Sequence, residues 1–321
     1  MHNNSRQIAI IGCGVSGLTC GLSLLENGYN VKILARELPP KTTSDVAGAF
    51  WYPHGIETGE KVRTWSKISL EKFQALAEIP GSGISMTTLH EFFDRQVPDS
   101  HWADFAPDFK AIVSGKTVTP WKFGYKYTSA KIDAPMYMNY LKQQFSGLGG
   151  IIQQENVKSL VELTHQYSIV VNCSGVWAKE LAHDRVYPIR GQVLLVRKPT
   201  DLPSDILYIS DPSSYCYIIP HKNHCILGST KEENNWSLKP DEKATQLIIE
   251  RCAKLNPVFA NPEILESKVG LRPGRPSVRL ELERISQKSA IIHNYGHGSI
   301  GHTIAWGCAK EVVMLVREIL E

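Results

Sequence analysis

Three glycines near the start of the chain have the spacing of a phosphate-binding turn. Gly12, Gly14 and Gly17 form a G-x-G-x-x-G pattern directly after the apolar residues 8–11. Glycines there allow a tight turn, a close approach of the backbone to a pyrophosphate, and a helix N-terminus directed at the phosphates. The stretch LTCGLSLLENG that follows favours a helix, and residues 30–35 favour a second strand. The segment therefore predicts a β-α-β unit that binds a dinucleotide.

A second glycine-rich turn lies near the other end of the chain, where residues 293–301 read HNYGHGSIG. The two turns together suggest one large planar dinucleotide held by remote parts of the chain. His293 and His297 are four residues apart, but Gly296 and Gly298 disfavour a continuous helix between them. We therefore expect no metal site there, and we expect His297 to structure the loop rather than to act as a catalyst.

Three arginines close together could bind a carboxylate. A guanidinium group meets two carboxylate oxygens at once and stays charged at any working pH. Arg272 follows Gly270 and Leu271 and precedes a proline that stiffens the segment, whereas Arg275 and Arg279 follow within seven residues. Residue types alone leave the choice among the three open.

The bulk composition is that of an ordinary globular protein. Of 321 residues, 42% are hydrophobic and 21% are charged, and the net charge is +3 without a block of basic residues, which argues against a nucleic-acid partner. No apolar run approaches the roughly 18 residues of a membrane span, so no membrane association is expected. The start MHNNSRQ lacks the features of a signal peptide, and a cytoplasmic location is expected. The assembly state is open, with a homodimer as one alternative.

The seven cysteines include no C-x-x-C pair. Most of them lie in apolar or glycine-containing runs, which favours reduced and buried thiols over disulfides or a zinc site. They are Cys13, Cys20, Cys173, Cys216, Cys225, Cys252 and Cys308.

The remaining pattern of apolar residues indicates a mixed α/β chain. Helices are predicted at residues 62–78, 131–145, 243–254 and 303–320. Strands are predicted at residues 151–157 and 169–174, and period-two strands between residues 191 and 228. Residues 86–126 are rich in aromatic side chains and lack a clear strand or helix period, so we expect a loop-rich substrate region inserted into the cofactor-binding part.

Several segments together resemble the D-amino-acid oxidase family, which includes the D-aspartate oxidases. The matching stretches follow the order of the family from one end of the chain to the other. They are IGCGVSGL at 11–18, TTSDVAGAFWYP at 42–53, VVNCSGVWA at 170–178, YPIRGQVLLV at 187–196, YIIP at 217–220, VGLRPGRPSVRLE at 269–281 and HNYGHGSIGHTIAWGCA at 293–309.

The resemblance implies FAD as cofactor and a mixed α/β fold of two domains. A Rossmann-like FAD-binding domain would comprise residues 1–82, 130–182 and 266–321, and a strand-rich antiparallel substrate domain residues 83–129 and 183–265. The implied reaction is oxidative deamination of a D-amino acid, a small-molecule substrate, with O2 as electron acceptor, giving a 2-oxo acid, ammonia and H2O2. The alternatives are a D-aspartate or D-glutamate oxidase, a glycine or sarcosine oxidase, a nicotinamide-dependent dehydrogenase and a flavin-binding protein without turnover.

The resemblance also assigns the cofactor contacts along the chain. One departure concerns the ribose, because Arg36 occupies the place where family members often carry an acid, and Glu37 follows it. The implied FAD contacts are Gly12, Cys13, Gly14, Val15, Ser16 and Gly17 at the pyrophosphate; Arg36 and Glu37 near the ribose; Thr43, Ser44, Gly48, Ala49 and Phe50 toward the flavin; Val157 at the adenine; and Gly298, Ser299, Ile300, Gly301, His302 and Thr303 along the isoalloxazine.

For the substrate, the resemblance places Arg272 and the phenol of Tyr217 at the carboxylate. The backbone carbonyl of Ser299 would accept a hydrogen bond from the amine and so hold the Cα hydrogen toward the flavin; no general base is assigned. The family's lid tyrosine falls at Ser213, and Tyr215 is the candidate replacement.

The side chain that the substrate carries is the open question. Tyr52 and His54 follow the flavin-facing segment, and His54, Lys231 and Ser299 resemble the D-aspartate oxidase branch. On the other side, Phe50 and Trp51 favour neutral side chains. We expect neutral or broad specificity ahead of acidic specificity.

Overall fold

The computed structural model describes residues 7–53, 59–93, 102–113, 121, 123–211 and 213–320. It begins with the predicted β-α-β unit, in which two neighbouring strands are parallel and Ile8 pairs with Val31. Its elements are β1 (Ile8–Ile11), α1 (Val15–Glu26) and β2 (Val31–Ala35).

A six-stranded sheet extends this unit in the order β15-β16-β8-β1-β2-β7. All neighbours in it are parallel except the pair β15 and β16. Both faces are covered, so that Ile8 and Ile10 of β1 pack on one side and Ala9 and Ile11 on the other, which explains its continuous apolar run. The added strands are β7 (Ile151–Gln154), β8 (Ile169–Asn172), β15 (Arg279–Arg284) and β16 (Ala290–Tyr295).

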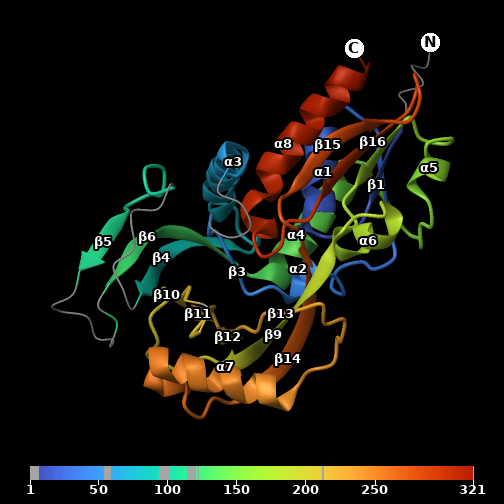
Figure 1. Cartoon of the computed structure of the whole chain (residues 1–321). Helices are drawn as coiled ribbons and strands as arrows, with labels where there is room; N and C mark the ends of the chain where they lie inside the picture. Colours follow the sequence, from blue (N-terminus) through green and yellow to red (C-terminus); the bar gives the residue numbers. More distant parts are fainter. Residues whose placement is uncertain are drawn as a thin grey trace.

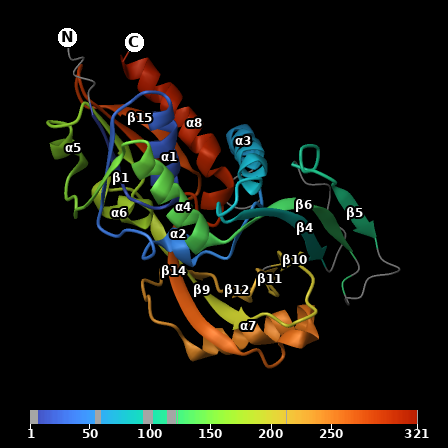
Figure 2. The same ribbon diagram turned by 180° about the vertical axis from the view of Figure 1, so that it is seen from behind.

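Helices lie on both faces of this sheet (Figures 1 and 2). The predicted helix at residues 131–145 begins three residues later, because the side chain of Asp133 caps the backbone N–H of Met136 and Pro135 occupies the first turn. One face carries α1, α4 (Ala134–Gly147) and α8 (Gly301–Leu320). The other carries α5 (Leu160–Leu163), and η1 (Gly175–Trp177) and α6 (Ala178–Leu181) follow β8.

The second sheet has ten strands and is mostly antiparallel, as the period-two pattern predicted. The order is β13-β9-β12-β11-β10-β4-β6-β3, with β14 paired to β9 and β5 paired to β6. From β9 onward its strands are β9 (Tyr187–Arg197), β10 (Ile206–Ile209), β11 (Cys216–Pro220), β12 (His224–Gly228), β13 (Glu232–Glu233) and β14 (Ile264–Gly274).

One face of the ten-stranded sheet is covered by α7 (Glu242–Leu255) and η2 (Pro257–Phe259), which lie along its lower side in Figure 1. In β11, Cys216 and Ile218 face this helix, whereas Tyr217 and Ile219 face the opposite side. The alternation decides which residues of the strand can reach a ligand between the two sheets.

The expectation of a loop-rich region at residues 86–126 is wrong for the two long strands that border it. β4 (Ile84–Phe93) and β6 (Phe123–Ile132) pair along ten residues each, and β5 (Lys110–Val113) adds to β6. Their sequence lacks a clean period because β4 lies between two partners and carries polar groups at positions that the fold buries, such as Glu91.

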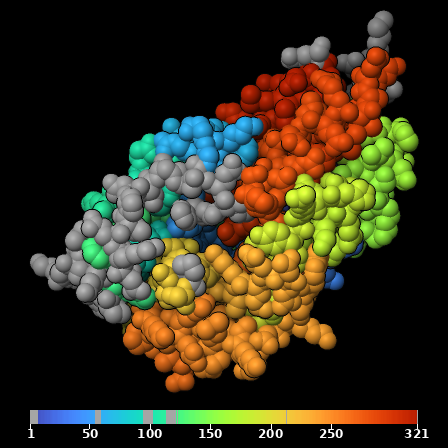
Figure 3. Space-filling model, viewed as in Figure 1, coloured from blue at the N-terminus to red at the C-terminus, as the bar shows by residue number. Residues whose placement is uncertain are grey.

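The chain that follows β2 forms α2 (Thr43–Val46), β3 (Ala49–Phe50) and α3 (Glu60–Ala77). Helix α3 packs against α8. In Figure 3, α8 and the strands near it form the upper surface, and α7 and its flanking segments form the lower one. Strands β6 and β14 of the ten-stranded sheet cross the domain boundaries that the sequence predicted, and β3 of the same sheet lies in the predicted FAD-binding part. These boundaries stay a prediction.

All seven cysteines are buried free thiols, which confirms the prediction from their spacing. In the part of the chain that the structure describes, no helix combines the length and the apolar character that a membrane crossing requires.

Candidate active site

A cavity of about 600 Å³ lies between the two sheets. It begins at the carboxyl ends of β1 and β2, the position where parallel sheets bind ligands. It ends among aromatic residues of the ten-stranded sheet. Nearly all of the residues predicted to contact FAD line this single cavity, and Gly17 is the exception. The lining residues from that set are Gly12, Cys13, Gly14, Val15, Ser16, Arg36, Glu37, Thr43, Ser44, Gly48, Ala49, Phe50, Val157, Gly298, Ser299, Ile300, Gly301, His302 and Thr303.

The first glycine turn can hold only glycines at two of its positions. Gly12 has φ +108°, and a Cβ atom there would lie 2.4 Å from the carbonyl oxygen of Cys173. A Cβ atom on Gly17 would lie 2.0 Å from the carbonyl oxygen of Gly12, so this glycine supports the turn from behind instead of facing the cavity. The backbone N–H of Val15 donates to the hydroxyl of Ser44 at 3.0 Å, which ties the first turn of α1 to α2.

At the end of β2, Arg36 and Glu37 both line the cavity, as does Val157. The guanidinium of Arg36 lies 3.6 Å from the ring centre of Trp177 and forms an exposed ion pair with Glu37 at 3.1 Å. The two side chains therefore lie together at the cavity edge, within reach of a ribose held by the glycine turn.

The C-terminal turn closes the same cavity from the other side. His297 hydrogen-bonds the side-chain oxygen of Asn294 at 2.9 Å and lies 3.4 Å from the hydroxyl of Ser16, and burial lowers its pKa to about 4. The loop-structuring role expected of His297 agrees with these contacts. Thr303 at the start of α8 accepts a hydrogen bond from the backbone N–H of Tyr52 at 3.2 Å, which joins the turn to the segment after β3.

Arg272 reaches the cavity from β14. Its guanidinium donates to the hydroxyl of Ser229 at 2.9 Å and to the carbonyl oxygen of Thr230 at 3.1 Å. The side chain crosses directly over Gly191 of β9, where a Cβ atom would lie only 2.1 Å from Nη1. In the described part of the chain Arg272 has no acidic ion-pair partner, so its charge is available to a ligand.

The two alternative arginines are already paired. Arg275 donates to the carboxylate of Asp184, and Arg279 donates to Asp184 at 3.1 Å and to Glu281 at 2.7 Å. Burial alone would raise the pKa of Asp184, but hydrogen bonds from Tyr295 and Arg275 outweigh this effect and hold the pKa below its usual range. Neither Arg275 nor Arg279 lines the cavity, whereas Arg272 does, and its role as the carboxylate ligand stays a prediction.

Tyr217 belongs to a group of aromatic side chains at the Arg272 end of the cavity. The rings of Tyr217 and Phe50 have centroids 5.9 Å apart, and those of Tyr52 and Tyr208 are 4.8 Å apart. Tyr215 is 92% buried and packs at 6.2 Å from Tyr217. We call these five residues the aromatic wall. Sequence reasoning proposed all but Tyr208, which has no motif to mark it.

Lys231 also lines the cavity, with its ammonium group 4.2 Å from the ring centre of Tyr215. Its side chain is on the exposed side of this wall. Trp51, which we expected to favour neutral substrates, does not contribute: it is fully buried and its Nε1 donates to the carbonyl of Ser66. A one-residue step along the chain places it on the opposite side from Phe50. His54 lies outside the described residues.

Sequence reasoning missed Glu91 behind the aromatic wall. Glu91 is only 1% exposed, and its Oε1 accepts a hydrogen bond of 2.6 Å from the hydroxyl of Tyr52. Burial raises its pKa to about 7, against the opposing effect of the Tyr52 hydrogen bond. The available signal was its position, two residues from Leu89 on the buried face of one strand.

The residues of the cavity fit FAD. The first turn leaves no room for a Cβ atom at Gly12, and it lies at the N-terminus of a helix whose N-cap residue, Gly14, has no capping side chain. Farther along, Nδ1 of the buried His302 has no hydrogen-bond partner among the described residues, while its Nε2 is 3.1 Å from the carbonyl of Ser44. An unpaired buried nitrogen on the cavity lining is suited to a polar atom of a ligand.

Comparisons with known proteins agree with this fit. The family profile of the FAD dependent oxidoreductases matches residues 7–315. The chain is 40% identical over 308 residues to a D-amino-acid oxidase of Rubrobacter xylanophilus, covering 95% of this chain and 94% of that protein. It is 34% identical over 333 residues to a human D-aspartate oxidase, covering 98% and 96%.

Among solved structures, the glycine oxidase of Geobacillus kaustophilus superposes with a TM-score of 0.82 at 18% identity, covering 98% of this chain and 95% of that one. At that identity the likeness concerns the fold, which is the two-sheet arrangement described above. The profile match and the two relatives also identify the family. The chain belongs to the family of FAD-dependent oxidoreductases that contains the D-amino-acid oxidases.

Proposed function

We propose that the protein oxidatively deaminates D-amino acids with FAD as cofactor and O2 as electron acceptor. The observation that carries this proposal is one continuous cavity with a dinucleotide cradle at one end and, at the other, a partly buried arginine that has no acidic partner among the described residues. Full-length relatives named D-amino-acid oxidase support the chirality of the substrate. Oxidation gives an imino acid and H2O2, and water then hydrolyses the imino acid to a 2-oxo acid and ammonia.

The substrate carboxylate binds to Arg272 and to the hydroxyl of Tyr217. The guanidinium keeps its two present hydrogen bonds to Ser229 and Thr230, so it is oriented before the substrate arrives. Burial raises the pKa of Tyr217, and its phenol therefore stays protonated and able to donate to the carboxylate at working pH. Charge-assisted contacts of this kind fix both the position and the direction of the substrate.

The amine is held by the backbone carbonyl of Ser299, as the sequence resemblance implied, and this orients the Cα–H bond. Bound FAD supplies the two-electron acceptor and passes the electrons to O2. The chain's own part is positioning and the exclusion of water. The acids that line the described cavity, Glu37, Glu155 and Glu180, belong to the cofactor end, and burial raises the pKa of the Cys13 thiol to about 12. These residues support a mechanism without a protein base.

Neutral side chains fit the substrate end better than acidic ones. The side chain of the substrate lies against the aromatic wall, where Phe50, Tyr208 and Tyr52 offer apolar ring faces. Glu91 behind Tyr52 adds a negative charge above its pKa, which opposes a second carboxylate. The ammonium group of Lys231, which lines the cavity beside Tyr215, favours an acidic side chain instead. It supports D-aspartate or D-glutamate as a second candidate substrate class.

A peroxide assay tests the proposal. Purified protein should show flavin absorbance and release H2O2 from D-alanine, D-methionine or D-phenylalanine but not from the L-enantiomers. Peroxide from glycine or sarcosine alone would replace this function by that of a glycine oxidase. Bound FAD without turnover of any amine would remove the enzymatic proposal altogether.

The predicted domain division, homodimer and cytoplasmic location remain predictions. We propose that the six-stranded sheet forms the FAD-binding domain and that the ten-stranded sheet forms the substrate domain. Limited proteolysis with and without FAD tests the division, sedimentation tests the mass of the assembly, and cell fractionation tests the location.

A further inference from the structure

Two histidines flank a two-residue turn at one end of the ten-stranded sheet. His221 follows β11 and His224 begins β12, with Lys222 and Asn223 between them. The backbone N–H of His221 donates to the carbonyl of His224 at 2.8 Å, which makes them a cross-strand pair. Directly opposed residues project on the same face of a hairpin. Their rings accordingly stack, with centroids 4.8 Å apart and an interplanar angle of 27°.

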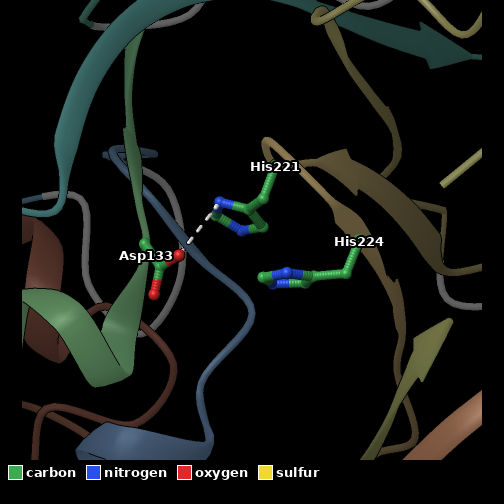
Figure 4. Close-up of side chains that lie close together, drawn as sticks. All are labelled: Asp133, His221 and His224. Atoms are coloured by element: carbon green, nitrogen blue, oxygen red, sulfur yellow. Dashed lines mark ion pairs between the residues drawn. The ribbon is translucent and has the colours of Figure 1, made fainter. Parts of the chain in front are cut away.

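Asp133 approaches this pair from the N-cap position of α4 (Figure 4). Its Oδ1 caps the helix, and its Oδ2 lies 3.8 Å from Nδ1 of His221. This distance is too long for a hydrogen bond. It is close to the separation of about 3.3 to 3.5 Å between two ligands of one tetrahedral zinc ion with bonds of about 2.0 to 2.1 Å. One ligand atom from each of Asp133, His221 and His224 lies within 4.8 Å of the others.

The protonation states suit metal ligation. Burial lowers the pKa of His221 to about 4 and also lowers that of His224, so both imidazoles are neutral and have a free lone pair near neutral pH. Three lysines oppose a cation, because Lys131 and Lys198 act on His221 and Lys268 acts on His224. Two of these charges are partly satisfied elsewhere: Lys131 donates to the carbonyl of Ser204, and Lys268 pairs with Glu266.

We propose that Asp133, His221 and His224 bind one Zn²⁺ ion, with water completing a tetrahedral shell. Two imidazole nitrogens and one carboxylate oxygen form a ligand set that zinc accepts, whereas Mg²⁺ and Ca²⁺ prefer oxygen ligands. Small rotations of the three side chains are enough to bring their ligand atoms from at most 4.8 Å to bonding positions.

The site would join two segments of the chain outside the cavity. His221 and His224 flank the turn between β11 and β12, while Asp133 directly follows β6 of the same ten-stranded sheet and caps α4, a helix that packs against the six-stranded sheet. None of the three lines the cavity. The ion would therefore tie the β11–β12 turn to the junction of β6 and α4, and its effect is read in stability and metal binding, independently of turnover.

The test uses the FAD-loaded full-length protein after treatment with a chelator and its removal. Isothermal titration with Zn²⁺ should give one site per chain, and the midpoint of thermal unfolding should rise with Zn²⁺ and fall again with EDTA. Titration with Mg²⁺ should give no binding. Co²⁺ should show the visible absorption of tetrahedral coordination.

Two variants remove ligands without removing structure. Asp133→Asn keeps a good N-cap for α4, and His224→Ala changes a partly exposed side chain. Each should lower the affinity for Zn²⁺ by about tenfold or more, whereas His165→Ala, an exposed histidine elsewhere, should bind as the wild type does. The proposal is overturned by the absence of saturable Zn²⁺ binding, or by binding that both ligand variants leave unchanged.

Discussion

The buried carboxyl group of Glu91 should make the stability of the protein fall as pH rises, the reverse of the behaviour of most carboxylates. Its pKa is raised from 4.5 to about 7 in the folded protein. Below pH 4.5 the folded and unfolded states both carry the proton. Between pH 4.5 and 7 only the unfolded state releases it, so the folded state loses stability over this window. Above pH 7 both states are ionised and the loss is complete.

The size of the effect follows from the shift. A change from 4.5 to about 7 corresponds to roughly 3 kcal/mol at about 1.4 kcal/mol per pH unit. Glu91→Gln keeps an oxygen that can accept the hydrogen bond of Tyr52 and removes the charge. The variant should therefore match the wild type near pH 4.5 and exceed its free energy of unfolding by roughly 3 kcal/mol at pH 8.

Thermal unfolding of the FAD-saturated proteins across pH 4.5 to 8.5 measures this difference. The quantity to compare is the thermal unfolding midpoint of the variant minus that of the wild type at each pH. This difference cancels the contributions of all other titrating groups. Glu71→Gln on the exposed surface of α3 is the matched control and should follow the wild type at every pH. A difference between Glu91→Gln and wild type that stays constant across the range would refute the reasoning.

Three further predictions concern the cavity. Arg272→Ala should retain FAD and lose about 2 to 5 kcal/mol of transition-state binding, or roughly 30-fold to several thousandfold in kcat/KM; steady-state kinetics that match the wild type would reassign the carboxylate. Gly191→Ala should lower kcat/KM by about tenfold or more while flavin absorbance is kept, because its Cβ would overlap the guanidinium of Arg272. Lys231→Met should lower kcat/KM for D-aspartate and leave that for D-alanine nearly unchanged; an equal loss on both substrates would remove Lys231 from side-chain selection.

The parts of the fold that sequence could predict are those specified by local patterns. The β-α-β unit depends on glycines within six residues of one another, and Gly12 and Gly17 occupy positions where a Cβ atom has no room. The helices at α3, α7 and α8 followed from apolar periodicity within one segment. The strands β4 and β6 could not be found in the same way, because their stability comes from partners about 40 residues away in the chain.

The site shows the same division. The resemblance proposed Arg272 as the carboxylate ligand. Only the fold shows that Arg275 and Arg279 donate hydrogen bonds to Asp184 instead of facing the cavity. Glu91 carries no motif, and it acquires its altered pKa from the burial that the packed sheets impose. In the cluster of Asp133, His221 and His224, the aspartate is nearly 90 positions away from the histidines in the chain, so the cluster could not be predicted from local spacing.

The cofactor cradle draws on residues 12–16 and on residues 298–303, at opposite ends of the chain. During synthesis the first half of the cradle leaves the ribosome long before the second half exists. Binding of FAD by both halves must therefore wait until translation has passed residue 303. A protein that ends before Gly298 would lack the second half of the cradle and should not retain FAD, although Arg272 and Tyr217 are still present.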